Sequence, residues 1–340
     1  MEKRDVVVYS EDYKKLVDAA ALKDKYYEID ERVEEICKEA FKGCDRLKEI
    51  VMPKKLKKID SESFRGCTGL TELTLPDSVM SIGKGAFCGC SGLTELTLPN
   101  SVRLIEVSAF EGCSGLTELT LPNSVKSIGD GAFAYCSGLE KITVESGNSR
   151  YNSRDNCNSI IDKKTNTLIA GCKNSVIPNS VTSIGRYAFQ GCSGLTELTL
   201  PNSITSIGDY AFAYCSDLSK ITSLAEIPPM CGREVFDGVN KTNCELIVPI
   251  VSVIAYKQAE VWNEFSNISG FSGVEDTVAD GNTIRAIGNQ IEIIGDFTSV
   301  EVYGINGALI YKGKDNVVTV PSAGIYLVHV ADKTRKIVVE

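Results

Sequence analysis

The chain has very little of what most catalytic sites require. Among its 340 residues there is one histidine, His329, and one tryptophan. His329 lies in an alternating apolar run typical of a strand, so we expect it on a strand surface rather than in the role of a base. With a single histidine, no Ser-His-Asp or Cys-His arrangement can be assembled in the rest of the chain. The sequence therefore predicts no catalytic residues and no enzyme.

The chain also lacks the marks of membrane, secretory and nucleic-acid-binding segments. No run of 18 apolar residues occurs, so no membrane span is expected. The first five residues do not form the apolar core of a signal peptide, so an exported form is expected to be a mature one. The net charge is −9 and basic patches with interleaved aromatic residues are missing, which argues against a nucleic-acid partner. A hydrophobic content of 43% over this length allows a large core and two folded units.

Cysteine is abundant but is not spaced for metal binding. None of the thirteen cysteines forms a Cys-x-x-Cys pair, so the sequence predicts no zinc or other metal site and no cofactor. Seven recur in one column, where we expect buried small apolar side chains whose sulfur atoms do not converge. This column consists of Cys44, Cys67, Cys90, Cys113, Cys136, Cys192 and Cys215. Pairing of Cys157 with Cys172, or of Cys231 with Cys244, stays open, because each pair lies within one irregular segment.

What the chain does have is an internal repeat. A phrase close to Leu-Pro-Asn-Ser-Val-x-Ser-Ile-Gly, followed by Ala-Phe, Cys and Leu-Thr-Glu-Leu-Thr-Leu, returns at intervals of 23 residues. The phenylalanine of the repeat falls at Phe41, Phe64, Phe87, Phe110, Phe133, Phe189 and Phe212. One copy cannot bury its own apolar face, so the copies are expected to stack into a solenoid with a continuous core.

Each copy contains a segment with the pattern of a half-buried strand. In residues 70–75 apolar and polar residues alternate, which puts Leu73 and Leu75 inside and Glu72 and Thr74 outside. Stacked copies predict a parallel sheet with strands about 4.8 Å apart. Its outward side, here called the strand face, comprises Glu72, Thr74, Glu95, Thr97, Glu118, Thr120, Lys141, Thr143, Glu197, Thr199 and Lys220. The strand face is either a solvated surface or an acidic, threonine-rich binding surface for a basic or hydroxyl-rich partner.

The Ser-Ile-Gly-x-x-Ala-Phe part of each copy is expected to form the return side of the coil. Ile82 and Phe87 should point inward there. The glycine of this phrase is expected to provide a turn with positive φ, at Gly83, Gly129, Gly185 and Gly208. Asp60 and Glu106 occupy the same position in two other copies, so either glycine is not required there or those coils are distorted.

These copies resemble the BspA-like leucine-rich repeats of bacterial surface proteins. The resemblance rests on segments such as 98–102, Leu-Pro-Asn-Ser-Val, and 127–133, Ser-Ile-Gly-Asp-Gly-Ala-Phe, and it covers roughly residues 36–268. It implies an α/β solenoid of leucine-rich repeats, with a parallel sheet on one side and short turns or helices on the other. It also implies an extracellular or cell-surface protein with a role in adhesion to host matrix proteins or to another cell surface.

Three segments depart from the repeat. Residues 145–177 interrupt it with a predicted β-hairpin, 158–162 with 167–171, which is either a decorated coil or a loop that shapes a binding surface. We expect this insertion to be removable without emptying a column of the core. Residues 11–24 have helical spacing and belong to a predicted N-terminal cap, 1–35. The solenoid spans 36–268, and its last part, 224–268, is expected to be a C-terminal cap with a short helix that buries Trp262.

Residues 269–340 have a different pattern. Short β-rich runs with turns between them predict a small all-β sandwich. Segments 300–311 and 323–330 resemble the C-terminal sorting domain of type IX secretion cargo, which implies a role in export. An immunoglobulin-like accessory domain is the alternative.

The leading hypothesis is a non-enzymatic binding protein whose solenoid recognises a protein partner through the strand face. A carbohydrate-binding module and a structural spacer are the alternatives. Glycan binding would require clustered exposed aromatic residues, for which the candidates are Tyr135, Tyr187, Tyr210 and Tyr214, all on the return side.

Overall fold

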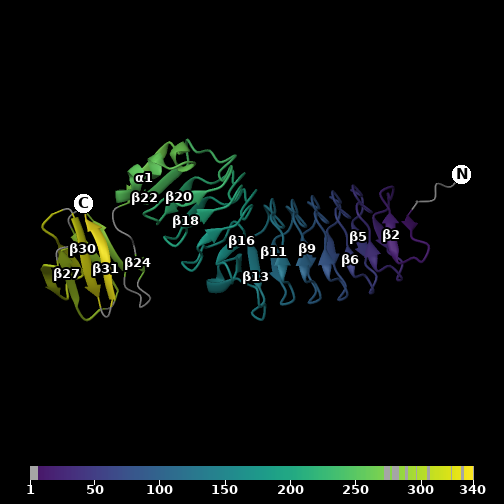
Figure 1. Cartoon of the computed structure of the whole chain (residues 1–340), viewed down its shortest axis with the longest axis horizontal. Coiled ribbons are helices and arrows are strands. Elements are labelled where there is room, and N and C mark those ends of the chain that lie inside the picture. Colours follow the sequence, from purple (N-terminus) through teal and green to yellow (C-terminus); the bar gives the residue numbers. More distant parts are fainter. Residues whose placement is uncertain are drawn as a thin grey trace.

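The computed structural model describes residues 7–271, 276–277, 283–287, 290–295, 297–304, 307–322, 324–330 and 333–339. The N-terminal residues used above to look for a signal peptide lie outside these ranges. Residues 7–271 form a stack of coils that leads to the helix α1 (Val253–Gln258). The stack changes direction once, between the strands β13 (Lys141–Val144) and β18 (Glu197–Leu200), as Figure 1 shows. The predicted solenoid is therefore confirmed.

The return side of the coils forms a parallel sheet of its own, here called the serine–isoleucine sheet. Two-residue strands pair in register, so that Ile105 lies between Ile82 and Ile128 of the adjacent coils. Before the insertion its strands are, in order, β1 (Val8–Tyr9), β2 (Lys15–Asp18), β4 (Glu35–Ile36), β6 (Lys58–Ile59), β8 (Ser81–Ile82), β10 (Leu104–Ile105) and β12 (Ser127–Ile128). Only β1 runs antiparallel to its neighbour among these strands. Turns and short strands, without helices in the described repeat coils, make up this side.

The Leu-Thr-Glu-Leu-Thr-Leu segments form the other side, but their pairing is interrupted. Before the insertion they pair in twos, as β3 (Tyr26–Glu28) with β5 (Glu49–Val51), β7 (Glu72–Thr74) with β9 (Glu95–Thr97), and β11 (Glu118–Leu121) with β13. After it they form one four-stranded sheet of β18, β20 (Lys220–Ser223), β22 (Glu245–Pro249) and β23 (Asn267–Phe271). Leu73 and Leu75 are buried, as the alternation predicts.

The phenylalanine and cysteine columns hold successive coils together. From Phe41 to Phe133 the rings stack nearly parallel, with centroids 4.8 to 5.7 Å apart. Each column thiol between Cys67 and Cys136 donates a hydrogen bond to the carbonyl oxygen of a phenylalanine in the preceding coil, at 3.1 to 3.3 Å. The sulfur atoms therefore point along the stack at carbonyl groups, which explains why no disulfide joins them.

The prediction of positive φ at the Ser-Ile-Gly glycines is wrong. Gly83 and Gly129 do not have positive φ, and the backbone of the preceding coil lies close against them. A Cβ at Gly83 would lie 2.7 Å from the carbonyl carbon of Asp60, so glycine is required there for close approach of two coils. Positive φ occurs instead at glycines directly before column cysteines, such as Gly112 at 74°.

The predicted helix at residues 11–24 is also wrong. Residues Lys15–Asp18 form β2, and Leu16 pairs with Ile36 of the next coil. Of the residues that suggested a helix, Leu16 is buried, whereas Tyr13 and Val17 are exposed. Leu16, Ala19 and Leu22 instead fill the core as the residues of an additional coil do.

The insertion contains the predicted hairpin, β15 (Ser159–Asp162) with β16 (Thr167–Gly171). With β14 (Tyr151–Asn152), the hairpin begins a second, six-stranded sheet on the same side, which continues with β17 (Ser183–Ile184), β19 (Ser206–Ile207) and β21 (Met230–Cys231). A 3₁₀ turn, Arg154–Asn156, precedes the hairpin. On the turns that hold the phenylalanine and cysteine columns nothing is inserted, and the Tyr135 amide donates directly to the Gln190 carbonyl oxygen at 2.7 Å. The insertion, here called the wedge, therefore adds width on one side of the stack only, and this accounts for the change of direction.

This wedge is part of the core, so the expectation that it can be removed without emptying a column is wrong: Leu168 pairs with Ile184 of the serine–isoleucine column. Ile160, Ile161 and Leu168 are fully buried, and Cys172 is 1% exposed. Two separate hydrophobic clusters meet here, one ending at Cys172 and the other beginning at Cys157. Deleting the hairpin would empty the junction between them.

The C-terminal end of the stack is closed by apolar side chains of the last coil. The 3₁₀ turn Ile250–Ser252, helix α1 and the 3₁₀ turn Trp262–Glu264 follow one another there. Trp262 is fully buried against Phe236, Tyr256 and Phe265, and its indole N–H donates to the Pro229 carbonyl oxygen at 2.8 Å. This confirms the predicted packing role of the tryptophan.

The C-terminal segment has its own core and two four-stranded sheets. One sheet consists of β24 (Asp276–Thr277), β25 (Thr283–Ile287), β26 (Gln290–Ile294) and β29 (Val317–Thr319). The other consists of β28 (Leu309–Gly313), β27 (Val300–Gly304), β30 (Gly324–Val330) and β31 (Lys333–Val339). All of the described pairs are antiparallel, and residues such as Ile291, Val302 and Val328 fill the core, so the all-β fold expected there is present.

Candidate functional site

The strand face has the residues that the sequence predicts, and they point outward. They come from six strands, β7, β9, β11, β13, β18 and β20, because the outward positions of each strand are the glutamate or lysine and the following threonine. The side chains that alternate with them, such as Leu119 and Ile142, are buried. Ten of the eleven predicted residues are exposed and Lys220 is half-buried.

The register brings these residues together in three groups rather than in one continuous row. Glu72 lies beside Glu95, and Thr74 beside Thr97. A second group is Glu118 and Thr120 with Lys141 and Thr143, and a third is Glu197 and Thr199 with Lys220 and Thr222. The insertion separates the second group from the third.

Charge is distributed unevenly over the three groups. Glu118 forms an ion pair with Lys141 at 3.2 Å, and both side chains are largely exposed, so the pair stabilises the fold by at most about 1 kcal/mol. Within the described residues, no ion pair involves Glu72 or Glu95. The first group is therefore the one with uncompensated negative charge.

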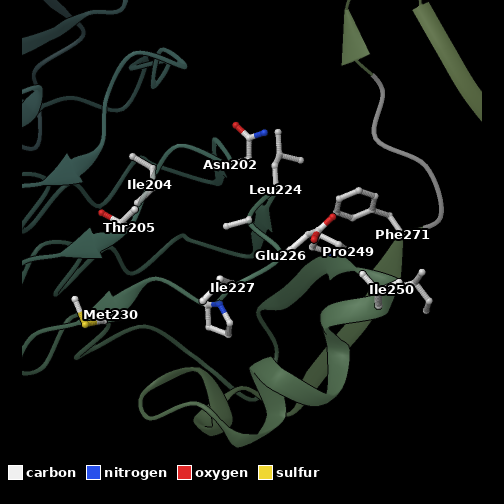
Figure 2. A pocket seen from close by; sticks show the side chains of 13 residues that line it. Asn202, Ile204, Thr205, Leu224, Glu226, Ile227, Met230, Pro249, Ile250 and Phe271 are labelled. Carbon is white, nitrogen blue, oxygen red and sulfur yellow. The ribbon is translucent and has the colours of Figure 1, made fainter. Parts of the chain in front are cut away.

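A cavity that the sequence did not predict opens near the C-terminal end of the stack, and we call it the turn cavity. It has a volume of about 620 Å³. Its walls come from the turns that join β18 to β19 and β20 to β21, from the 3₁₀ turn after β22, and from the end of β23 (Figure 2). Its lining is mostly apolar and includes Ile204, Leu224, Ile227, Pro249 and Phe271.

The cavity arises where a hydrogen-bond ladder between turns ends. In earlier coils the serine of Pro-Asn-Ser, or of Pro-Asp-Ser, donates to a carbonyl oxygen of the preceding turn, as Ser101 does to Val79 and Ser203 to Val181, at 2.7 and 2.6 Å. The next turn is one residue longer, and Glu226 takes the place of the serine, followed by Ile227-Pro228-Pro229. No serine is available there to close the turn onto its neighbour, so the two turns separate.

The rim of the turn cavity carries unusually exposed apolar side chains. Ile227 is 82% exposed, Met230 74% and Val251 60%. Exposed apolar side chains gathered around a hollow are typical of protein-binding surfaces. The departure of Ile227-Pro228-Pro229 from the repeat was the sequence signal that could have indicated this site.

Groups for catalysis or metal binding do not come together in the described part of the chain. All thirteen thiols are free, including the two pairs that the sequence left open. Burial raises the pKa of Cys90 and of Cys136 to about 12, so these thiols are not nucleophiles near neutral pH. His329 lies on β30, as expected, and its Nδ1 is 2.9 Å from the Thr334 hydroxyl. Among the described residues, no three His, Cys, Asp or Glu side chains are arranged to hold a metal ion.

Residues 34–161 and 159–243 match a model of the BspA type leucine rich repeat region, in six copies. The chain belongs to the BspA-type leucine-rich repeat family. This confirms the resemblance found in the sequence.

Crystal structures of other proteins have a similar fold. The chain is 26% identical to a leucine rich cell surface protein from Faecalibacterium prausnitzii, with a TM-score of 0.54 over 76% of this chain and 83% of that one. It is 25% identical to the pneumococcal vaccine antigen PcpA, with a TM-score of 0.56 over 67% of this chain and 63% of that one. No curated protein sequence matches the chain. Within its described part, the BspA-type chain has no helix long and apolar enough to cross a bilayer.

Proposed function

We propose that this chain is a non-enzymatic binding protein of the cell surface or extracellular space, and that its strand face recognises a protein partner. The observation that carries the proposal is the group of Glu72, Thr74, Glu95 and Thr97, with two neighbouring carboxylates that lack an ion pair among the described residues. Such a surface complements a basic partner. Adhesion to host matrix proteins or to another cell surface is the role we propose, by analogy with the family and with the cell-surface protein to which the chain is similar.

The C-terminal sandwich, 269–340, is proposed to serve export or attachment rather than recognition. Its resemblance to a type IX sorting domain supports this assignment, and an immunoglobulin-like accessory role is the alternative. The division into a cap at 1–35, a solenoid at 36–268 and this sandwich is part of the same proposal.

The test is a binding screen of the whole chain against purified extracellular-matrix proteins and against a glycan array. Strand-face recognition predicts a matrix-protein ligand whose affinity falls as salt concentration rises. Glu72→Lys with Glu95→Lys should weaken that affinity about tenfold at low salt, because two attractive charges become repulsive. The matched control is Glu31→Lys with Glu260→Lys, which makes the same change of net charge at exposed positions away from the strand face. Equal loss in both variants would contradict the proposal, and glycan binding alone would favour the carbohydrate module.

The turn cavity is a second candidate site, favoured by its apolar rim. Its occupant would be a large apolar side chain of a protein partner. A partner surface would also cover the exposed apolar rim, which a small molecule inside the cavity would leave in contact with water. Ile227→Asp with Met230→Asp should abolish such binding without loss of stability, because both side chains are mostly exposed. Unchanged binding to every ligand from the screen would exclude the turn cavity.

A further inference from the structure

Two tyrosines occupy backbone positions where the same chain otherwise uses glycine. Tyr135 and Tyr214 directly precede column cysteines and have φ of 57° and 59°. In other coils this position is glycine with φ between 71° and 74°, at Gly43, Gly66, Gly89, Gly112 and Gly191. A side chain other than glycine is strained in this conformation. The backbone conformation of stacked coils favours glycine at these two positions, so stacking does not explain why tyrosine is present there.

The two rings meet over the glycine of the coil between them. A Cβ on Gly191 would lie 2.2 Å from Cδ1 of Tyr135, so only glycine fits beneath that ring. The centroids of Tyr135 and Tyr214 are 5.8 Å apart, and the ring planes are inclined by 38°. Tyr214 is 47% exposed and Tyr135 is half-buried, so the pair presents an open aromatic surface to solvent.

Carboxylates surround this tyrosine pair. Asp237 lies beside Tyr214 in the next coil, where its carbonyl oxygen accepts from the Tyr214 amide at 2.6 Å. Hydrogen bonding to Asp237 and the charges of Asp237 and Glu234 raise the pKa of Tyr214. Burial, the neighbouring Tyr214, and the charges of Glu111 and Asp237 raise the pKa of Tyr135. In the described part of the chain, Glu111, Glu234 and Asp237 form no ion pair with a lysine or arginine.

Elsewhere in the chain, an arginine side chain lies near both a tyrosine ring and a carboxylate. The guanidinium of Arg32 lies 3.8 Å from the centroid of Tyr13 and pairs with Asp30. Tyr13 also has positive φ, at 57°. Arg186 lies 5.5 Å from the centroid of Tyr187 and contacts Asp130 and Asp209. A third case joins Arg150, Tyr151 and Asp162.

We propose that Tyr135 and Tyr214, with Glu111, Glu234 and Asp237, form a binding site for an arginine side chain of a partner protein. The site contains the tyrosine and carboxylate groups of the three internal examples and lacks their arginine. Arginine fits better than lysine, because its planar guanidinium stacks on an aromatic ring while it donates to carboxylates. A neutral sugar would form no ion pair with these carboxylates. The site lies on the turns before the column cysteines and does not depend on the strand face.

The experiment uses the full chain with ¹³C-labelled tyrosine rings and two probes, acetyl-arginine-methylamide and its neutral isostere acetyl-citrulline-methylamide. Saturable shifts of the Tyr135 and Tyr214 signals with the arginine probe, and none with the citrulline probe, are expected in aromatic NMR spectra. Glu234→Gln with Asp237→Asn should weaken the arginine response about fivefold, because charge attraction is lost. Equal responses to both probes would overturn the proposal. So would a saturable response to a neutral oligosaccharide with none to arginine, which would assign the site to a glycan.

Glycine variants separate a binding role from a structural one. Tyr135→Gly with Tyr214→Gly restores the residue of the other coils, removes the strain, and should keep or raise the melting temperature. Ligand-observed NMR should show that this variant no longer binds the arginine probe. The matched control, Tyr13→Gly, changes a tyrosine of the same backbone conformation that already has Arg32 over its ring, and it should bind the probe as the wild type does. A lower melting temperature in the first variant, without arginine binding by the wild type, would make the rings a structural clamp and overturn the site.

Discussion

The coils before the insertion and those from it onward are built from one repeat but differ in what they leave exposed. In the first set five phenylalanine rings stack in a row, and glycine precedes each column cysteine up to Gly112. Tyr135, in the last coil before the insertion, and Tyr214, after it, replace two of these glycines. Only after the insertion does a Pro-Pro turn follow the place of a missing serine and the turn cavity open. The difference teaches that stacking sets the residue types wherever a coil repeats, whereas a coil that departs from the repeat creates a candidate binding surface.

The largest effect is expected from breaking the phenylalanine column inside the regular stack. Phe110 is fully buried between Phe87 and Phe133, so Phe110→Ala should lower the free energy of unfolding by about 3–5 kcal/mol. Phe133→Ala, at the end of the row and 7% exposed, should cost less. Urea denaturation of both variants measures the difference. A loss below about 1 kcal/mol for Phe110→Ala would show that the column does not hold the stack.

The next largest loss of stability is expected at Gly191, after the insertion, and is compared with that at Gly43, before it. Gly191→Ala combines a φ of 71° with a Cβ placed 2.2 Å from the Tyr135 ring, and should lower the free energy of unfolding by about 2–4 kcal/mol. Gly43→Ala has the same type of backbone, at 74°, with open space around the new methyl group, and should cost roughly 1–2 kcal/mol. Equal losses in thermal or urea unfolding would show that the tyrosine does not restrict its neighbour.

Stability should fall at high pH through the buried thiols. Burial raises the pKa of Cys90, Cys136 and Cys192 from an ordinary value of 9.0 to about 12. In the unfolded chain these thiols lose their protons near pH 9, so the native state binds more protons above that pH. The thiol contribution is therefore fully present below pH 9 and is lost as pH rises from 9 toward 12. Urea unfolding at a series of pH values measures it, and a Cys90→Ala variant with an unchanged pH slope would contradict it.

The same thiols should react slowly in the native state. Peptide mapping after mild alkylation should find the column cysteines unmodified, and the half-buried Cys37 and Cys88 modified first. Detection of a disulfide between any two column cysteines would contradict the ladder of thiols and carbonyl groups.

The smallest effect concerns the hydrogen bonds that serine side chains donate between neighbouring turns. Ser101→Ala removes one hydrogen bond to the Val79 carbonyl oxygen and should cost about 0.5–1.5 kcal/mol of unfolding free energy. Ser91→Ala, at an exposed turn, is the control and should change nothing measurable. Equal unfolding free energies for the two variants would show that the serine hydrogen bonds do not hold neighbouring turns together.

The columns could be read from the sequence because each core position recurs with the same residue type. Phe87, Ile82 and Leu73 all face inward for that reason. The N-terminal coil was predicted as a helix because Tyr13, Leu16, Val17 and Ala20 have a spacing that suits a helix, while pairing with the next coil selected a strand. The role of Gly83 was missed because a close approach between coils leaves no mark within a single repeat.

The candidate surfaces were only partly predictable. The outward direction of Glu72 and Thr74 followed from alternation within one strand. The break in pairing between β9 and β11, and the separation of the second group from the third by the insertion, depend on how neighbouring coils stack and were not predictable from one repeat. The turn cavity depends on one extra residue beside Pro228 and on a missing serine, and both features matter only when neighbouring turns are in place.

The most direct test of strand-face recognition compares two exposed surfaces with the same ligand. Deletion of the hairpin is unsuitable because Ile160 and Leu168 are buried, so exposed residues at its tip, Lys164 and Thr165, are changed instead. The measurement is the affinity of the partner from the binding screen for Glu72→Lys with Glu95→Lys, and for Lys164→Glu with Thr165→Glu, at low and high salt. Strand-face recognition predicts that the first variant binds about tenfold more weakly at low salt and that the second keeps the wild-type affinity. Loss of binding in the hairpin-tip variant with full binding by the strand-face variant would contradict it and assign recognition to the insertion.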